Sequence, residues 1–341
     1  MNGAELEERS AEDKCLERCV ERIFGRESRA YLMGIAMIWI VLFHVYFWCL
    51  TSGIDTPWWI RLFDRATIGV DILFTLSAFG LQASWERNSV SRFYFNRFTR
   101  LFPVYFLFLL VLFTTFERNC PIDRVVVQSV CQLTGLSLFK YPEFFSCNFC
   151  FDWFTPAIIL FYLSFPLLSK AVTWINKKGL AAEMIVLALL LFLGVWIRVN
   201  KHFMFGLLAL RMPLIYLVMS SCIYIKRHDS QKILSLCIWG ACLGLLSGYE
   251  AMALSMITPV LLIVYSLSCF KQPFKWFVSL IGKHSYEVYL AHIFVVAFFI
   301  PMKTITNVFV LLSITIVSTI VIATLFAYVQ SKFQSSIRKV H

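Results

Sequence analysis

The chain has 341 residues, of which 59% are hydrophobic and 15% charged, and its formal net charge is +11. With a mean hydropathy of +0.74, this composition excludes a soluble globular domain, whose interior cannot bury so much apolar surface. Stretches of about 20 nearly uncharged residues recur, each long enough to cross a bilayer as a helix. The sequence therefore predicts an all-α polytopic membrane bundle. Its positive charge then marks topology and contact with membrane lipid rather than nucleic acid.

The two ends of the chain differ from its centre. Residues 1–29 are dense in mixed charge and lack the apolar core and the cleavage site of a signal peptide. They are expected to form a cytoplasmic amphipathic tail, followed by a membrane domain at residues 30–330 and a second cytoplasmic tail at residues 331–341.

About ten spans are expected, with one shorter helix between the third and the fourth. The short run Val125–Phe139 contains several polar residues, so it is expected to be a re-entrant or surface helix packed against protein. With that run not crossing, all basic clusters fall on one face, which the positive-inside rule makes cytoplasmic. Both termini are then cytoplasmic in a multi-pass protein of the cell (plasma or inner) membrane. The expected spans are Tyr31–Leu50, Thr67–Trp85, Leu101–Phe116, Trp153–Leu168, Leu180–Val199, Phe203–Ile225, Ile233–Ser247, Ala251–Cys269, His284–Ile300 and Val308–Tyr328.

The cysteines fall into two groups. Most lie inside apolar spans, where a cysteine behaves as a small hydrophobic residue. Cys120, Cys147 and Cys150 lie in polar connections, where a disulfide can form if that side is oxidising. The spacing leaves open whether Cys147 and Cys150 pair, and it indicates no metal site.

One ionisable residue, His44, lies in the middle of the first span. Titratable groups inside a membrane are rare and usually functional. A low-dielectric site favours the neutral imidazole, which can take a proton from a hydroxyl group. A histidine that only hydrogen-bonds a neighbouring helix would show the same pattern, and both interpretations stay open.

Other charged residues near the spans also need partners. Asp71 in the second span requires a cation, and Arg211 in the sixth requires an anion, for which Asp71 or Glu287 could serve. Arg97 and Arg100 are three residues apart and share a helix face. Together with Arg92 they would suit a phosphorylated ligand, although cytoplasmic anchoring alone explains such a cluster equally well.

A polar face is predicted on the ninth span. Ser285, Tyr289 and His292 follow one another at i, i+4 and i+7, so they lie on one side of a helix. In a membrane such a face must point into the interior of the bundle.

In order and spacing these stretches resemble the acyltransferase-3 family of membrane acyltransferases, from about Arg29 to Tyr328. The resemblance implies a ten-helix bundle that takes an acyl group, usually acetyl, from coenzyme A on the cytoplasmic side. It further implies transfer to a hydroxyl group of a carbohydrate, as in the O-acetylation of cell-surface polysaccharides or of a lipid-linked precursor. The segments that carry it are Gly34–Ala36, Val41–His44, Gly69–Phe74, Phe95–Tyr105, Trp153 with Tyr162 and Pro166, Arg211–Pro213 and Ser285–His292.

The resemblance also implies roles for individual residues. His44 corresponds to the family's histidine, acting as a base or as the site of an acyl-histidine, and the sequence does not separate these two routes. Arg97 and Arg100 correspond to arginines that bind acetyl-coenzyme A, with Arg92 as a third. Apart from the resemblance, the buried polar residues of the other spans make Arg211, Ser285 and Tyr289 candidates for stabilising the oxyanion, and Asp71, Glu287 and His292 candidates for a structural polar role.

One position departs from the family pattern. Many members have an arginine in an Arg-x10-His spacing before the histidine, and here Met33 occupies that place. Arg29, one turn earlier, is expected to contribute to the donor site instead. The same departure would fit a catalytically inactive, acyltransferase-like membrane partner. A transporter or flippase is a third reading, but such proteins often have two similar halves, and the sequence shows no internal repeat.

Overall fold

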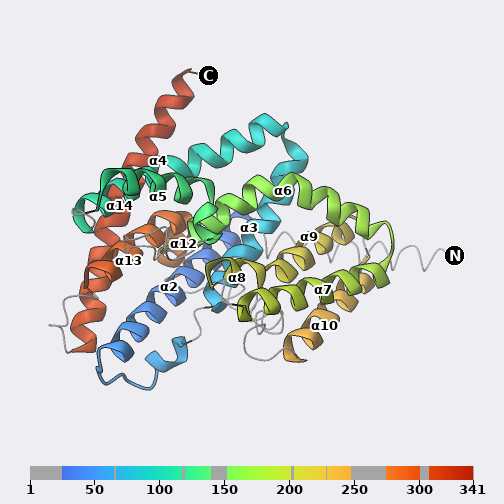
Figure 1. Ribbon diagram of the computed structural model, residues 1–341, viewed down its shortest axis with the longest axis horizontal. Helices are drawn as coiled ribbons and strands as arrows, with labels where there is room; N and C mark the ends of the chain where they lie inside the picture. The colour runs from blue at the N-terminus through green and yellow to red at the C-terminus, as the bar shows by residue number, and fades with distance from the viewer. Residues whose placement is uncertain are drawn as a thin grey trace. The chain divides into compact units, whose positions relative to one another are not determined.

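The computed structural model describes residues 25–64, 67–116, 120–139, 152–200, 203–227, 229–246, 274–299 and 307–340. In these ranges the secondary structure is helical and no strand occurs, so the predicted all-α membrane bundle is confirmed (Figure 1). Within them, seven helical stretches are long and apolar enough to cross a bilayer, and two shorter apolar helices, Ser230–Leu246 and Ser285–Val296, accompany them. The protein is therefore a multi-pass membrane protein.

The helices follow the predicted order of spans. The main helices are α2 (Arg26–Thr51), α3 (Thr67–Arg87), α4 (Val90–Phe116), α5 (Ile122–Thr134), α6 (Phe154–Asn176), α7 (Leu180–Val199), α8 (Phe203–Ala209), α9 (Met212–Lys226), α10 (Ser230–Leu246), α12 (Lys275–Lys283), α13 (Ser285–Phe299) and α14 (Val308–Val340), with 3-10 turns η1 (Ile60–Phe63) and η2 (Leu136–Phe139).

Several helices extend beyond their predicted spans, α14 to Val340 and α6 to Asn176 among them, and two differences have a clear local cause. Helix α4 begins at Val90 rather than Leu101, because Ser89 caps it: the Ser89 hydroxyl accepts a hydrogen bond from the Arg92 N–H at 3.4 Å. The expected sixth span is broken into α8 and α9, with Leu210 and Arg211 in a turn between them. The expected eighth span, Ala251–Cys269, and the N-terminal tail lie outside the described residues.

The chain packs into two compact units. The first unit comprises Met1–Gly34, Val70–Glu86 and Phe165–Gly282, and the second comprises Ile35–Gly69, Arg87–Ser164 and Lys283–His341. In the first unit α7 packs against α8, α9 and α10. In the second unit α14 packs along α13 and α4, as Figure 1 shows for α13 and α14.

In the first unit two glycines allow a close approach of backbones. A Cβ atom at Gly282 of α12 would lie 1.6 Å from the Ala30 carbonyl oxygen, and one at Gly34 would lie 1.9 Å from that of Val278. Either atom would overlap the facing backbone, so α2 and α12 can meet here only because both positions are glycine.

The first unit also contains a saturated polar cluster around Glu183, which is fully buried. The Glu183 carboxylate accepts hydrogen bonds from Asn176 Nδ2 at 2.7 Å, from the Tyr224 hydroxyl at 2.8 Å and from the Ser220 hydroxyl. Asn176 in turn accepts a hydrogen bond from Arg227 at 2.6 Å. This cluster ties α6, α7 and α9 together.

In the second unit, α5 has its polar side inward. Gln128 and Gln132 are buried, whereas Val126, Val127 and Val130 are exposed. The Gln132 side chain accepts a hydrogen bond from the Tyr105 hydroxyl of α4 at 3.0 Å. A helix with this distribution suits contact with lipid on one side and protein on the other, and its 13 residues are too few to span the bilayer.

Candidate active site

His44 lies partly buried on α2, in the second unit. Its Nδ1 is 2.8 Å from the carbonyl oxygen of Ile40, one turn earlier. A carbonyl oxygen only accepts hydrogen bonds, so Nδ1 must carry the proton. In the neutral ring the lone pair is therefore on Nε2, which makes no hydrogen bond with the described residues. In this tautomer Nε2 is the nitrogen that can accept a proton, as a general base does.

The ring of His44 faces a second histidine, His292 of α13, also in the second unit. The two ring centroids are 5.0 Å apart and the planes are inclined by 61°. His292 is fully buried, and neither of its ring nitrogens makes a hydrogen bond of ordinary geometry in the described part of the chain. A buried polar group without a partner is costly and calls for an explanation. We refer to His44 and His292 as the histidine pair.

Next to the histidine pair lies a carboxyl group that the sequence analysis missed. The Tyr289 hydroxyl donates a hydrogen bond of 2.8 Å to Oδ1 of Asp152, and the Tyr289 ring lies 5.2 Å from that of His292. The same Asp152 oxygen accepts the Thr155 N–H at 3.0 Å at the start of α6. An aspartate directly before an apolar span is the signal that could have identified this cap.

Asp152 is 4% exposed. Burial raises the pKa of the Asp152 carboxyl group above its ordinary value, and hydrogen bonds from Thr155, Tyr289 and Tyr105 offset part of this rise. Its other carboxylate oxygen, Oδ2, has no hydrogen-bond partner of ordinary geometry among the described residues. The carboxyl group, the tyrosine and the histidine pair thus form a continuous row of polar groups in the second unit.

The predicted polar face of the ninth span is present on α13. Ser285, Tyr289 and His292 are all buried, whereas Glu287, in the first turn of the helix, is partly exposed. The spacing rule therefore identified the inward side of this helix correctly.

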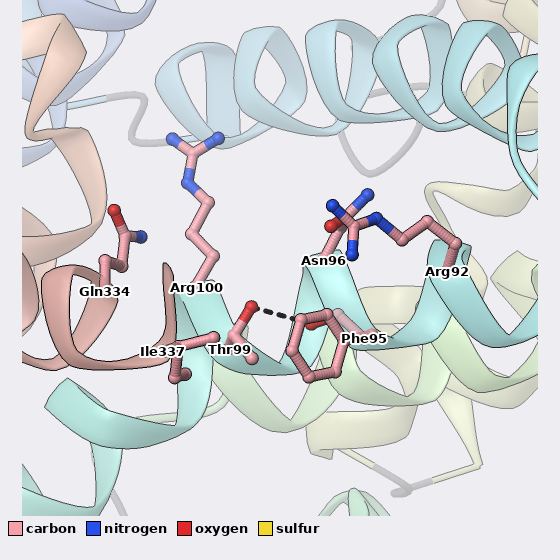
Figure 2. A pocket seen from close by; sticks show the side chains of 7 residues that line it. All are labelled: Arg92, Phe95, Asn96, Thr99, Arg100, Gln334 and Ile337. Carbon is pink, nitrogen blue, oxygen red and sulfur yellow. Dashed lines mark hydrogen bonds between the residues drawn. The ribbon is translucent and has the colours of Figure 1, made fainter. Parts of the chain in front are cut away.

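A pocket lined by two arginines lies between α4 and α14 in the second unit (Figure 2). Arg92, Asn96 and Arg100 follow one another at intervals of four residues along α4. Neither Arg92 nor Arg100 forms an ion pair within the described ranges, and no carboxylate lines the pocket. Its volume is about 260 Å³, and the residues that line this arginine pocket are Arg92, Phe95, Asn96, Thr99, Arg100, Gln334 and Ile337.

The two other expected donor-binding arginines lie elsewhere. Arg97 does not line the arginine pocket: it is partly buried, with its guanidinium carbon 5.7 Å from the centre of the Phe93 ring. Arg29 belongs to the first unit, where its guanidinium group lies against Gly80. A Cβ atom at position 80 would lie 2.5 Å from the Nη1 and Nη2 atoms of Arg29.

Asp71 and Arg211 form a buried ion pair in the first unit. Nε of Arg211 is 2.9 Å from Oδ1 of Asp71, and the two side chains are 4% and 6% exposed. Arg211 also donates a hydrogen bond to the Leu207 carbonyl group at 2.6 Å. The counter-ion of Arg211 is therefore Asp71, the first of the two partners that the sequence suggested, and it lies at the break between α8 and α9.

Comparison with known proteins gives one match. The family model described as an acyltransferase domain, that of the acyltransferase-3 family, matches residues 31–328. The chain belongs to the acyltransferase-3 family. No curated protein and no solved structure matches the chain. The resemblance stated from the sequence is thus confirmed, and the protein is a membrane acyltransferase.

Most of the candidate site lies inside the residues that the family model matches. The match includes the histidine pair, Asp152, Tyr289 and the α4 side of the arginine pocket, but it ends before Gln334 and Ile337. The α14 side of that pocket therefore lies beyond the region that the family model describes.

Proposed function

We propose that the protein transfers an acetyl group from coenzyme A to a hydroxyl group of a cell-surface carbohydrate or of its lipid-linked precursor. The observation that carries this proposal is the state of His44. Its Nδ1 proton is held by the Ile40 carbonyl group, so Nε2 is the basic nitrogen, inside an acyltransferase domain. The carbohydrate acceptor and the acetyl group rest on the family resemblance.

His44 acts as the general base of this reaction. Its Nε2 takes the proton of the acceptor hydroxyl as the acceptor oxygen bonds to the thioester carbonyl carbon. When the carbon–sulfur bond breaks, the proton passes from His44 to the departing thiolate. A positioned base of this kind contributes about 10²–10⁴-fold to the rate. The neighbouring His292 ring, with its centroid 5.0 Å from that of His44, places a second proton-carrying group beside the base.

The arginine pocket fits the phosphate groups of the donor. Coenzyme A carries a pyrophosphate and a 3′-phosphate at its nucleotide end, and guanidinium groups bind such anions through paired hydrogen bonds. At about 260 Å³ the pocket is smaller than the roughly 300–1,000 Å³ of sites that enclose a whole drug-sized ligand. It therefore suits the phosphate end of the donor rather than the entire molecule.

The orientation in the membrane follows from the two ends of α4. Arg92, Arg97 and Arg100 lie at its start, and Cys120, which is disulfide-bonded, follows its end. Basic residues favour the cytoplasmic side, and disulfides persist in oxidising compartments. Both features support the same direction, with the arginine pocket on the cytoplasmic side of the cell membrane, where coenzyme A is available, and with cytoplasmic termini.

The test is thioester hydrolysis by the purified full-length protein in detergent with acetyl-coenzyme A. His44→Ala should lower the slow release of free coenzyme A by at least about 10²-fold, and Arg100→Ala should raise KM. His284→Ala is the matched control, since His284 is exposed and adjoins the first residue of α13. Absence of both binding and turnover in wild-type protein would contradict the proposal and favour an inactive partner or a transporter.

A further inference from the structure

The hydrogen bonding of α4 is interrupted at Pro103, which lies inside the helix. Proline has no N–H group, so the carbonyl group four residues earlier, that of Thr99, has no donor within the helix. Lipid supplies no substitute, and such a carbonyl must be satisfied by a neighbouring helix. Gln330 of α14 does this: its Nε2 donates to the Thr99 carbonyl oxygen at 3.0 Å, and its side chain is almost fully buried.

The face of α14 that bears Gln330 continues into the arginine pocket. Gln334 and Ile337 follow Gln330 at i+4 and i+7, and both line the pocket. Figure 2 shows the Gln334 amide and the Arg100 guanidinium group extending side by side from the two neighbouring helices. The contact at Thr99 therefore fixes the position of the α14 wall of the pocket.

The composition of the pocket points to an anionic ligand. Its charged side chains are both cationic, they form no ion pair in the described chain, and the amides of Asn96 and Gln334 add hydrogen-bond donors. A phosphate group needs several N–H donors, and hydrogen bonds to charged groups are the stronger kind.

We propose that Gln334 is a specificity-determining residue that donates its amide N–H to a phosphate group at the nucleotide end of the donor, beside Arg100. Gln330 is the positioning residue that holds Gln334 there by completing the hydrogen bonding of α4 at Pro103. Both glutamines lie beyond residue 328, where the match to the family ends. The inference rests on the proposed function in taking coenzyme A as the donor.

The experiment compares two thioesters, acetyl-coenzyme A and S-acetylpantetheine, which lacks every phosphate group. Full-length protein in phosphatidylcholine nanodiscs is assayed for hydrolysis of both. Gln334→Ala should raise the KM for acetyl-coenzyme A about tenfold, the effect of one hydrogen bond to a charged group, with kcat and the use of S-acetylpantetheine unchanged. Ser335→Ala is the control, because Ser335 is exposed and bonds only within its own helix.

Several results would overturn the inference. Equal KM values for the Gln334→Ala and Ser335→Ala proteins would overturn the inference and leave the proposed function intact. An equal loss of kcat/KM by Gln334→Ala with both thioesters would have the same meaning. If phosphatidylglycerol nanodiscs stabilised wild type but not Gln334→Ala without coenzyme A, the pocket would hold a lipid phosphate instead. A wild-type protein that neither binds nor hydrolyses acetyl-coenzyme A would overturn the proposed function and this inference together.

The positioning role of Gln330 has its own test. Gln330→Leu should lower the midpoint of thermal unfolding and raise the KM for acetyl-coenzyme A. Pro103→Ala restores an N–H group that can reach the Thr99 carbonyl, so in that background Gln330→Leu should lower the midpoint less. An equal loss in both backgrounds would contradict the role assigned to Gln330.

Discussion

The protein has two buried polar clusters, one in each unit, which differ in whether their polar atoms are hydrogen-bonded. The Glu183 carboxylate in the first unit receives hydrogen bonds from three side chains, and one of these, Asn176, is itself bonded to Arg227. In the second unit His292 is equally buried, yet neither ring nitrogen makes a hydrogen bond of ordinary geometry among the described residues.

This difference distinguishes residues that stabilise the fold from residues that could take part in the reaction. A buried polar network whose members are all paired stabilises and orders a fold. A group left without a partner lowers stability, and proteins keep such groups mainly at functional sites. By this criterion the Glu183 cluster is structural, whereas the histidine pair has the character of a functional site.

The largest expected effect is on the Glu183 cluster. Glu183→Ala removes the acceptor of three buried donors, each of which then costs about 1–3 kcal/mol. The free energy of unfolding should fall by at least about 3 kcal/mol, seen as a lower midpoint in thermal unfolding in detergent. The protein that stays folded should hydrolyse acetyl-coenzyme A at the wild-type rate. A folded but inactive variant would remove the distinction between the two clusters.

Breaking the Asp71–Arg211 pair should have a similar cost. Asp71→Ala leaves a buried guanidinium group without its counter-ion, which typically destabilises a protein by about 3–5 kcal/mol. The double variant Asp71→Leu with Arg211→Met should recover most of this loss and keep activity. Loss of turnover in a stable double variant would instead assign Arg211 to the stabilisation of the oxyanion.

The opposite behaviour is expected for His292. Phenylalanine preserves the ring contacts with His44 and Tyr289 and removes two buried nitrogens that make no hydrogen bond of ordinary geometry in the described chain, so His292→Phe should leave the unfolding midpoint unchanged or raise it. Turnover of acetyl-coenzyme A should fall by about 10²-fold, the lower end of the range of acid–base effects. Wild-type turnover in this variant would make His292 a packing residue.

The smallest effect is a pH dependence that comes from Asp152. Because burial raises its pKa, the folded state binds more protons than the unfolded state between the ordinary and the raised pKa. Stability from this group is therefore present below the ordinary value of about 4 and is lost as pH rises through the raised value. Asp152→Asn should remove that loss, so thermal unfolding from pH 4 to 8 should show a flatter profile than wild type. Parallel pH profiles for the wild-type and Asp152→Asn proteins would contradict the assignment of this pH dependence to Asp152.

Much of the architecture could be predicted because apolar runs and basic clusters are local signals. Helix α7 has the predicted bounds, and α13 presents the predicted polar face. The early start of α4 could not be read in this way, since its first turns are rich in arginine and resemble a connection. The break before α9 was also missed, although Pro213 at the start of that helix was a usable signal.

The site was only partly predictable for a different reason. His44 and Tyr289 could be singled out as polar residues in apolar surroundings. Asp152 could not be linked to them, because it lies 137 positions before Tyr289 and only tertiary packing brings the two together. Likewise Arg97 and Arg100 are neighbours by helical spacing, yet only Arg100 lines the arginine pocket, because the Arg97 guanidinium group packs against Phe93 instead.

The inverted distribution of side chains on α5 has a consequence for how the protein is made. A segment of 13 residues with buried glutamines is too short and too polar to leave the translocation channel for lipid by itself. Its Gln132 side chain accepts hydrogen bonds from the Tyr105 hydroxyl of α4 and from the Ser137 hydroxyl of η2. We therefore expect α5 to dock only after α4 and η2 are available to pair its glutamines, which would make this docking a late step in biogenesis.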